Sequence, residues 1–232
     1  MSFSFIMLSL IVIFFNYGFI LLSFKMFGKI GLFMCIPVVL IIANVQVVIT
    51  TEIFGWAVTL GNVAYVSSYL ITDLIGELYD KRSAQKAVIF GFMSLFIVTV
   101  LMNLILLVEP TGDSIVAHES VAYIFGLLPR IFLGSIIAFA VSQTLDVAIF
   151  ARLKAKEGDK KLWIRNNVST ITSQVIDGLV FTFIAFYGVF PIEVVFEIFV
   201  TTYIIKTIVA TLDTPFMYLG VWLHKKGYVK EI

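Results

Sequence analysis

Two stretches of the chain repeat the polar pattern S-Q-x-x-D-x-x-x-F within sequence that is otherwise apolar. The first copy runs from Ser142 to Phe150, and the second from Ser173 to Phe181. A carboxylate or an amide is costly inside membrane hydrocarbon, so such groups usually face the interior of a helix bundle or a substrate path. The two copies therefore indicate a polar site between two helices. The alternatives are hydrogen bonds that hold neighbouring helices together, or a chance match in a biased composition.

The distance of each copy from the basic loop between them sets its depth. Gln143 and Gln174 each lie nine residues from the nearest arginine of that loop, so in straight helices both lie about 13 Å from the same membrane boundary. Because the two helices run antiparallel, Asp146 and Asp177 fall on opposite sides of that level. A two-fold axis in the membrane plane would relate the copies in this way. Inverted repeats with a site near the midplane are typical of transporters.

Other polar residues inside apolar runs are candidates for the same site or for a second one. Asp73 lies about 12 Å deep by the same counting, and Tyr69 stands one turn earlier on the same helical face. Asn44 is either a packing amide or a further wall of the site. Lys206 and Asp213 lie two turns apart on one face, where they could pair directly or through a bridging side chain and act as a coupling pair.

The composition and the lengths of the apolar runs predict an all-α membrane protein that crosses the bilayer many times. Of 232 residues, 60% are hydrophobic and 13% are charged, and the mean hydropathy is +1.05. Runs of about 20 apolar residues match the roughly 30 Å of hydrocarbon that a helix must span. We expect a single integral membrane domain over residues 1–232, with a six-helix core and a retained seventh span at the N-terminus that could be peripheral to it. The expected spans are residues 3–24, 30–49, 56–79, 87–108, 131–151, 168–189 and 196–223.

The distribution of basic residues predicts the orientation of the bundle. Fourteen of the 16 lysines and arginines follow the first, third and fifth spans or lie in the C-terminal tail; Arg130 and Lys206 are the exceptions. The positive-inside rule places these connections and the C-terminus in the cytoplasm, and the N-terminus outside. Residues 114–128 are expected to form an interfacial or re-entrant helix. Arg130 follows at the outer interface, where it either snorkels or contacts a ligand.

The sequence contains no motif of a soluble enzyme, so we expect no catalysis, no cofactor and no metal. It has no H-E-x-x-H, G-x-S-x-G or Walker pattern and no cluster of cysteines. His118 and His224 lie in a loop and in the tail, far from the polar cluster. The expected partners are a small-molecule substrate and the lipid bilayer, not a nucleic acid. The oligomeric state is left open, with a homodimer as one expectation.

Three segments resemble the queuosine-precursor transporter family, also called vitamin uptake transporters. They are the A-N-V-Q stretch at Asn44, the D-x-x-x-E-x-Y pattern that begins at Asp73, and the R-N-x-x-S-T-x-x-S-Q-x-x-D pattern that begins at Arg165. The resemblance covers about residues 35–220. It implies an importer in the inner membrane for 7-deazaguanine bases, such as the 7-cyano and 7-aminomethyl forms, which are used to make modified tRNA. The alternative is a substrate-capture subunit of an importer of the energy-coupling-factor type.

The polar residues singled out above suit such a base. Its edge presents an N–H and an amino group side by side, and a carboxylate can accept both. A glutamine amide can donate to the carbonyl oxygen, and aromatic side chains can cover the flat ring. The expected substrate-binding residues are Asp73, Gln143, Asp146, Gln174, Asp177, Tyr69 and Asn44.

Overall fold

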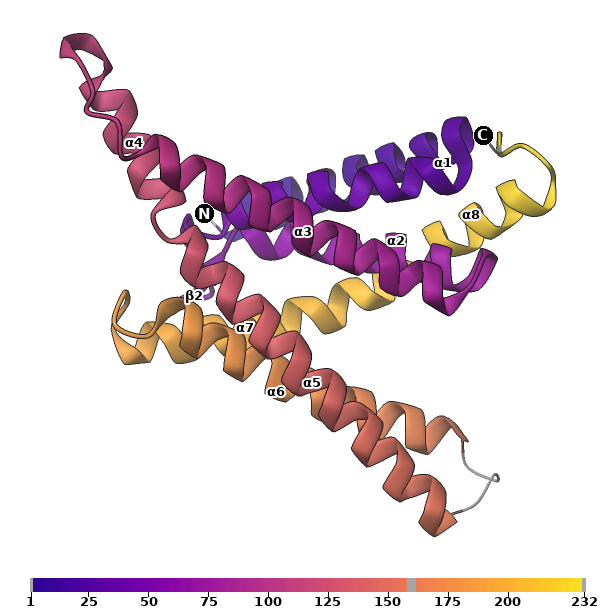
Figure 1. Cartoon of the computed structure of the whole chain (residues 1–232). Helices are drawn as coiled ribbons and strands as arrows, with labels where there is room; N and C mark the ends of the chain where they lie inside the picture. The colour runs from indigo at the N-terminus through magenta and orange to yellow at the C-terminus, as the bar shows by residue number, and fades with distance from the viewer. Residues whose placement is uncertain (1, 158–161, 231–232) are drawn as a thin grey trace.

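A computed structural model describes residues 2–157 and 162–230 of the chain, and helices make up nearly all of this part (Figure 1). The predicted all-α membrane bundle is thus confirmed, with one short β-hairpin added. The elements are α1 (Ser2–Gln46), β1 (Thr50–Ile53), β2 (Trp56–Thr59), α2 (Gly61–Leu78), α3 (Lys81–Ile105), the 3-10 turn η1 (Gly112–Ser114), α4 (Ile115–Phe125), α5 (Leu128–Glu157), α6 (Leu162–Phe186), α7 (Ile192–Leu212) and α8 (Thr214–Lys225).

The long helix α1 is a hairpin of two arms that turns at Gly28. This glycine has φ 56° and ψ −136°, a conformation that residues with a Cβ rarely adopt. The Ser23 hydroxyl donates to the Gly31 carbonyl at 3.1 Å. Eight residues of straight helix would separate these two by about 12 Å, so the contact shows that the chain reverses. The two predicted N-terminal spans, residues 3–24 and 30–49, correspond to the two arms.

The main apolar core lies where both arms of α1 pack against α2 and α8. Its largest fully buried members come from the two arms and from α2 and include Tyr17, Phe24, Leu32, Ile36, Leu70 and Leu74. Large apolar side chains elsewhere on α1 and α3, such as Phe19 and Leu101, are exposed. In water such faces would mark a contact surface, and in a bilayer they face the lipid tails.

The predicted third span, residues 56–79, is wrong over its first residues. They form strand β2, which pairs antiparallel with β1 so that Thr50 lies opposite Thr59. The turn at Phe54 and Gly55 has positive φ at both residues (52° and 82°), which suits a tight hairpin. The hairpin docks on α7, because the Ala57 N–H donates to the Glu197 carboxylate at 2.9 Å. Helix α2 therefore begins only at Gly61.

The predicted last span, residues 196–223, is also wrong, because it consists of two helices. Helix α7 ends at Leu212 and α8 begins at Thr214, with Asp213 between them. Pro215 stands in the first turn of α8, where proline is tolerated. Within a continuous helix it would lack a hydrogen-bond donor and clash with the preceding turn, so the chain breaks just before it.

Helices α5 and α6, which carry the two polar repeats, lie side by side and antiparallel (Figure 1). Ser142 contacts Asp177, and a Cβ on Gly134 would meet Ile184 at 3.4 Å. An earlier residue of α5 thus lies beside a later residue of α6. This confirms the predicted antiparallel pairing of the repeats. Arg130 closes the end of α6: its Nε donates to the Ile184 carbonyl at 2.7 Å and its guanidinium also donates to the Tyr187 carbonyl. The arginine thus satisfies carbonyls that a helix end leaves open.

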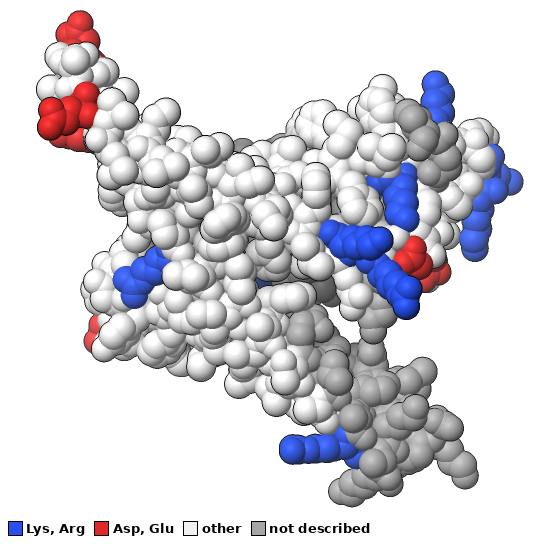
Figure 2. Space-filling model, in the orientation of Figure 1, with Lys and Arg blue, Asp and Glu red and all other residues white. Residues whose placement is uncertain are grey.

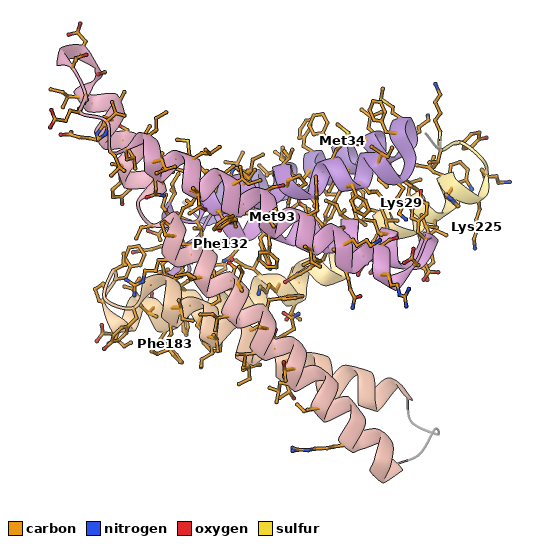
Figure 3. All side chains as sticks on the ribbon, in the orientation of Figure 1. Lys29, Met34, Met93, Phe132, Phe183 and Lys225 are labelled. Carbon is orange, nitrogen blue, oxygen red and sulfur yellow. The ribbon has the colours of Figure 1, made fainter. Side chains whose placement is uncertain are left out.

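Three segments of the described residues are long and apolar enough to cross a membrane: Met7–Gln46, Arg82–Ile105 and Gly112–Ser142. The first doubles back at Gly28, the third joins α4 to α5, and Ile171–Phe186 is a shorter apolar helix. Figure 2 shows most Lys and Arg gathered toward one end of the molecule, with some Asp and Glu among them, while only Asp and Glu are seen at the opposite tip near α4. Lys29 and Lys225 lie at the basic end (Figure 3). The chain is a multi-pass membrane protein with charge separated between its ends.

Asp80 fixes the turn between α2 and α3 at the basic end. Its carboxylate accepts hydrogen bonds from the backbone N–H and the hydroxyl of Ser83, at 2.7 and 2.6 Å, and so caps α3. These hydrogen bonds from Ser83, together with the charge of Lys29, hold the pKa of Asp80 below its ordinary value. Lys29 also donates to the Ser83 hydroxyl at 2.6 Å, which joins the turn of α1 to the start of α3.

Gly61 allows α2 to start in close contact with α1, so a side chain there should destabilise the protein. A Cβ at this position would lie 2.3 Å from the Ala43 carbonyl oxygen and 2.9 Å from the Val47 Cα, and backbone cannot move aside cheaply. We expect Gly61→Ala to lower the unfolding free energy by about 1–3 kcal/mol. The loss should appear as a lower midpoint in a thermal-aggregation assay of the detergent-purified protein. Gly18→Ala is the matched control, because a Cβ there meets nothing within 4 Å.

Candidate substrate-binding site

A pocket lies inside the bundle among α1, α2, α5, α6 and α7. The cavity itself has a volume of about 50 Å³, and the wider space among the side chains, which includes the part open to the outside, is about 540 Å³. The cavity volume is well below the roughly 300–1,000 Å³ usual for small-molecule sites, so the walls would have to separate to admit a ligand of that size. Apolar groups make up much of the wall, with Phe139 and Phe181 as its phenylalanine rings. The polar side chains of the wall are those of Asn44, Asn62, Tyr65, Ser135, Asp177, Thr202 and Lys206.

The charged centre of the pocket is an ion pair between Asp177 of α6 and Lys206 of α7. The Lys206 ammonium donates to Asp177 Oδ2 at 3.1 Å, and the two side chains are only 11% and 19% exposed. The Ser142 hydroxyl of α5 donates to Asp177 Oδ1 at 3.2 Å. The serine of the first polar repeat thus contacts the aspartate of the second. Three helices therefore hold one carboxylate in place, with a cation on one side of it.

Lys206 forms its ion pair with Asp177, and no ion pair joins it to Asp213 among the described residues, so direct pairing, one of the two alternatives considered, is not seen. The helix break after Leu212 is the reason, because it ends the regular turns that would have stacked the two side chains. Asp213 is nevertheless buried, at 7% exposure. The two members of the proposed coupling pair therefore belong to different sites.

Aromatic rings and an amide complete the walls around the ion pair. Lys206 Nζ lies 5.4 Å from the centroid of the Tyr65 ring, a distance at which the ring face attracts a cation. Tyr65 in turn contacts Tyr69 edge to face, with 5.8 Å between centroids. Asn62 Nδ2 donates to the Thr202 hydroxyl at 2.8 Å, which ties the start of α2 to α7. The site combines a carboxylate, an ammonium group and flat apolar surfaces.

The structure places the predicted substrate-binding residues at three kinds of position. Asp177 and Asn44 line the pocket, and the Asn44 amide donates to the Leu40 carbonyl at 2.7 Å. Tyr69 and Asp73 continue from Tyr65 along one face of α2, outside the lining, and Asp73 is exposed. Gln174 lies half-buried in α6, also outside the lining. The side chains of Gln143 and Asp146 lie outside the described residues, although their backbone belongs to α5.

Sequence reasoning missed Asn62, Tyr65 and Thr202, and it missed the partner of Lys206. Asn62 and Tyr65 precede Tyr69 and Asp73 at helical spacing. The polar face of α2 could therefore have been extended by two turns toward the N-terminus of the helix. Lys206 and Asp177 are opposite charges in neighbouring apolar spans. Because an unpaired charge inside a bundle is costly, their pairing could have been expected from charge alone.

The side chains of the pocket can accept and donate hydrogen bonds to a small polar molecule. Groups of three or more metal-binding side chains are absent from the described residues. What remains is a polar pocket near the middle of a bundle of apolar helices, reached by side chains from five of them. This fold and this site define a multi-pass membrane protein with a polar pocket inside its helix bundle, the build of a membrane transporter.

Comparison with known proteins identifies the family. Residues 59–220 match the family described as "Putative vitamin uptake transporter". The chain is 43% identical over 200 residues to the "Probable queuosine precursor transporter" of Bacillus subtilis (strain 168), covering 86% of this chain and 87% of the relative. It is 29% identical over 187 residues to the "Queuosine precursor transporter" of Escherichia coli (strain K12), covering 78% and 80%. The chain therefore belongs to the vitamin uptake transporter family, which confirms the resemblance seen in the sequence. No solved structure matches it.

Proposed function

We propose that this protein imports queuosine precursors, the 7-deazaguanine bases with a 7-cyano or 7-aminomethyl group, across the cell membrane. The Asp177–Lys206 pair inside an aromatic-walled pocket is the observation that carries the proposal. The names of the similar proteins support it, since two of them are described as transporters of a queuosine precursor. The imported base would supply the modification of tRNA.

The pair presents an acceptor and a donor side by side, which complements one edge of the base. That edge carries a carbonyl oxygen, a ring N–H and an amino group in a row. The Asp177 carboxylate can accept from the two N–H donors, as it would from a bidentate partner. The Lys206 ammonium can donate to the carbonyl oxygen, a role first considered for the glutamines. Phe139, Phe181 and Tyr65 offer faces for the ring.

The other predicted residues take a secondary place in this proposal. Tyr69 and Asp73 lie further along α2, beyond the pocket and toward the α2–α3 turn that Lys29 contacts. Together with Gln174, Gln143 and Asp146 they are candidates for contacts made as the base moves on from the pocket. Residues 1–232 would form one transport domain in the inner membrane, with the basic loops and the C-terminus in the cytoplasm.

Uptake into vesicles that contain only this protein tests the proposal. We expect labelled 7-cyano- or 7-aminomethyl-7-deazaguanine to enter proteoliposomes made from the purified chain, and unlabelled base to compete with it. In cells that cannot make the precursor, the same protein should restore queuosine in tRNA when one of these bases is added. Empty liposomes and empty-vector cells are the controls.

Two outcomes would contradict the proposal. If neither base enters the vesicles or restores queuosine, the substrate class is wrong. If uptake requires a second protein that co-purifies in fixed ratio, the chain is a substrate-capture subunit of the energy-coupling-factor type instead. A mass measurement on the purified protein separates this case from autonomous transport.

A further inference from the structure

The break between α7 and α8 holds a buried carboxyl group that the substrate pocket does not use. Asp213 occupies the break and is 7% exposed. A carboxyl at the start of a helix commonly accepts a hydrogen bond from the first turn, but the Asp213 side chain makes no such cap. Only its backbone carbonyl is engaged there, by the Met217 N–H at 2.9 Å. The carboxyl is therefore buried without a structural role in the helix end.

A buried hydroxyl without a partner faces the same break. Tyr17 of α1 is 0% exposed, and its hydroxyl has no hydrogen-bond partner among the described residues. Its ring packs 4.7 Å from the Phe216 ring in the first turn of α8, and its hydroxyl lies within electrostatic reach of the Asp213 carboxylate. A polar group of this kind is rare in a protein interior, and it points to a ligand or a changing partner at the site.

A second carboxyl group acts on Asp213 from α2. Asp73, an exposed carboxyl of α2, lies within electrostatic reach of Asp213. The two helices pack directly, since Gly220 of α8 leaves no room for a side chain against Leu74, the residue after Asp73. Tyr69 lies between the two regions, in electrostatic contact with both Asp73 and Asp177. A polar line thus runs from the substrate pocket along α2 to the helix break.

The acidic pair has no cation to balance it within the described part of the chain. Lys206 lies on α7, seven residues before Asp213, and forms its ion pair with Asp177 in the pocket. Among the described residues, the titratable groups within electrostatic reach of Asp213 are Tyr17 from α1 and Asp73 from α2. The buried Asp213 carboxylate bears the cost of its desolvation and the repulsion of the exposed Asp73 charge, and a proton on Asp213 removes both. Breaks in membrane helices are also where transporters place their coupling ions.

We propose that Asp213, with Asp73 as its neighbouring carboxyl, is the proton-binding site that couples substrate import to inward proton movement. The inference rests on the proposed transport function and adds its energy source. A proton from the outer side binds a carboxylate oxygen of the pair, which neutralises one charge while the substrate is bound. It leaves as H⁺ to the cytoplasm when the substrate does, and the carboxylate is restored. The coupling site is thus separate from the Asp177–Lys206 pair that holds the base.

The test separates coupling from substrate binding in proteoliposomes. A gradient of one pH unit can drive about tenfold accumulation if one proton enters with each base. We expect the wild type to accumulate labelled 7-cyano-7-deazaguanine when the inside is alkaline, and a protonophore to abolish this. Asp213→Asn should lose the accumulation and keep the exchange of labelled for unlabelled base. Glu77→Gln, which changes an exposed carboxyl on α2, should keep both.

Infrared difference spectra give a second readout that does not depend on transport. The purified wild type should show the band of a protonated carboxyl that disappears as pH rises, and folded Asp213→Asn should lack it. The proposal is overturned if Asp213→Asn accumulates base like the wild type, if it loses exchange as well, or if its carboxyl band is unchanged. It is also overturned if a sodium gradient alone drives accumulation. Absence of exchange by the wild type would instead remove the proposed transport function.

Discussion

Asp177→Asn is expected to insert into the membrane and to lose uptake of the deazaguanine base. The carboxylate accepts from Lys206 at 3.1 Å and from Ser142 at 3.2 Å, and in the pocket it would accept from the base as well. An asparagine replaces one of these acceptor oxygens by a donor, which then faces other donors. Hydrogen bonds to a charged group contribute about 1.5–3 kcal/mol, so affinity should fall by about tenfold to hundredfold. Uptake of labelled base by cells with matched protein levels measures the effect.

Two further variants show whether this loss is specific to the carboxylate. Leu179→Ala changes an exposed apolar residue of the same helix and should leave uptake near the wild-type value. Ser142→Ala removes one of the hydrogen bonds to Asp177 and should reduce uptake only modestly. Wild-type uptake by Asp177→Asn at equal expression would show that the carboxylate does not bind the substrate.

Lys206→Gln is expected to have the second largest effect, on both uptake and stability. It leaves the Asp177 carboxylate without its cation in a site where that side chain is 19% exposed. Removing one partner of a buried ion pair costs up to about 3–5 kcal/mol, because the remaining charge is uncompensated. The purified variant should therefore unfold at a lower temperature than the wild type in a thermal-shift assay, and it should not transport.

The double variant Asp177→Asn/Lys206→Gln separates stability from function. With both charges removed, no uncompensated charge remains, so the unfolding temperature should return toward the wild-type value while uptake stays lost. Lys225→Gln, at an exposed position of α8, is the control for removing a lysine and should change stability little. If the destabilising effects of the two single variants simply add, the two side chains do not form a stabilising pair.

Much of the fold follows from hydropathy and glycine placement, and the two errors each have their own cause. The apolar run lengths predicted the helices, and Gly28 marked the turn between the arms of α1. Strand β2 was assigned to a helix because a short apolar run has no periodicity that separates the two structures. The break at Asp213 was missed although Pro215 signals it, because proline also occurs inside membrane-spanning helices. Both segments matter for the proposed function. The β-hairpin docks on α7, which carries Lys206, and the helix break holds the buried Asp213.

The candidate site was predictable along each helix but not between helices. The twin repeats predicted an antiparallel pair of helices, and the contact between Ser142 and Asp177 confirms that pairing. Which faces of α2 and α7 turn toward them depends on how the helices rotate and cross. The rotation and crossing angles of the helices are set by packing between them, and the periodicity of a single helix does not predict these angles. Charge balance suggests Lys206 as a partner for Asp177, and helical spacing suggests Asn62 and Tyr65, but only the structure shows that these side chains meet in one pocket.

Equilibrium binding to the purified protein tests most directly the claim that Asp177 reads the donor edge of a deazaguanine base. The wild type should bind 7-cyano-7-deazaguanine and bind the analogue without the 2-amino group about tenfold more weakly, since one hydrogen bond to the carboxylate is lost. Asp177→Asn should bind both ligands weakly and no longer distinguish them. Equal affinity of the wild type for the two ligands, or full discrimination by Asp177→Asn, would contradict the account.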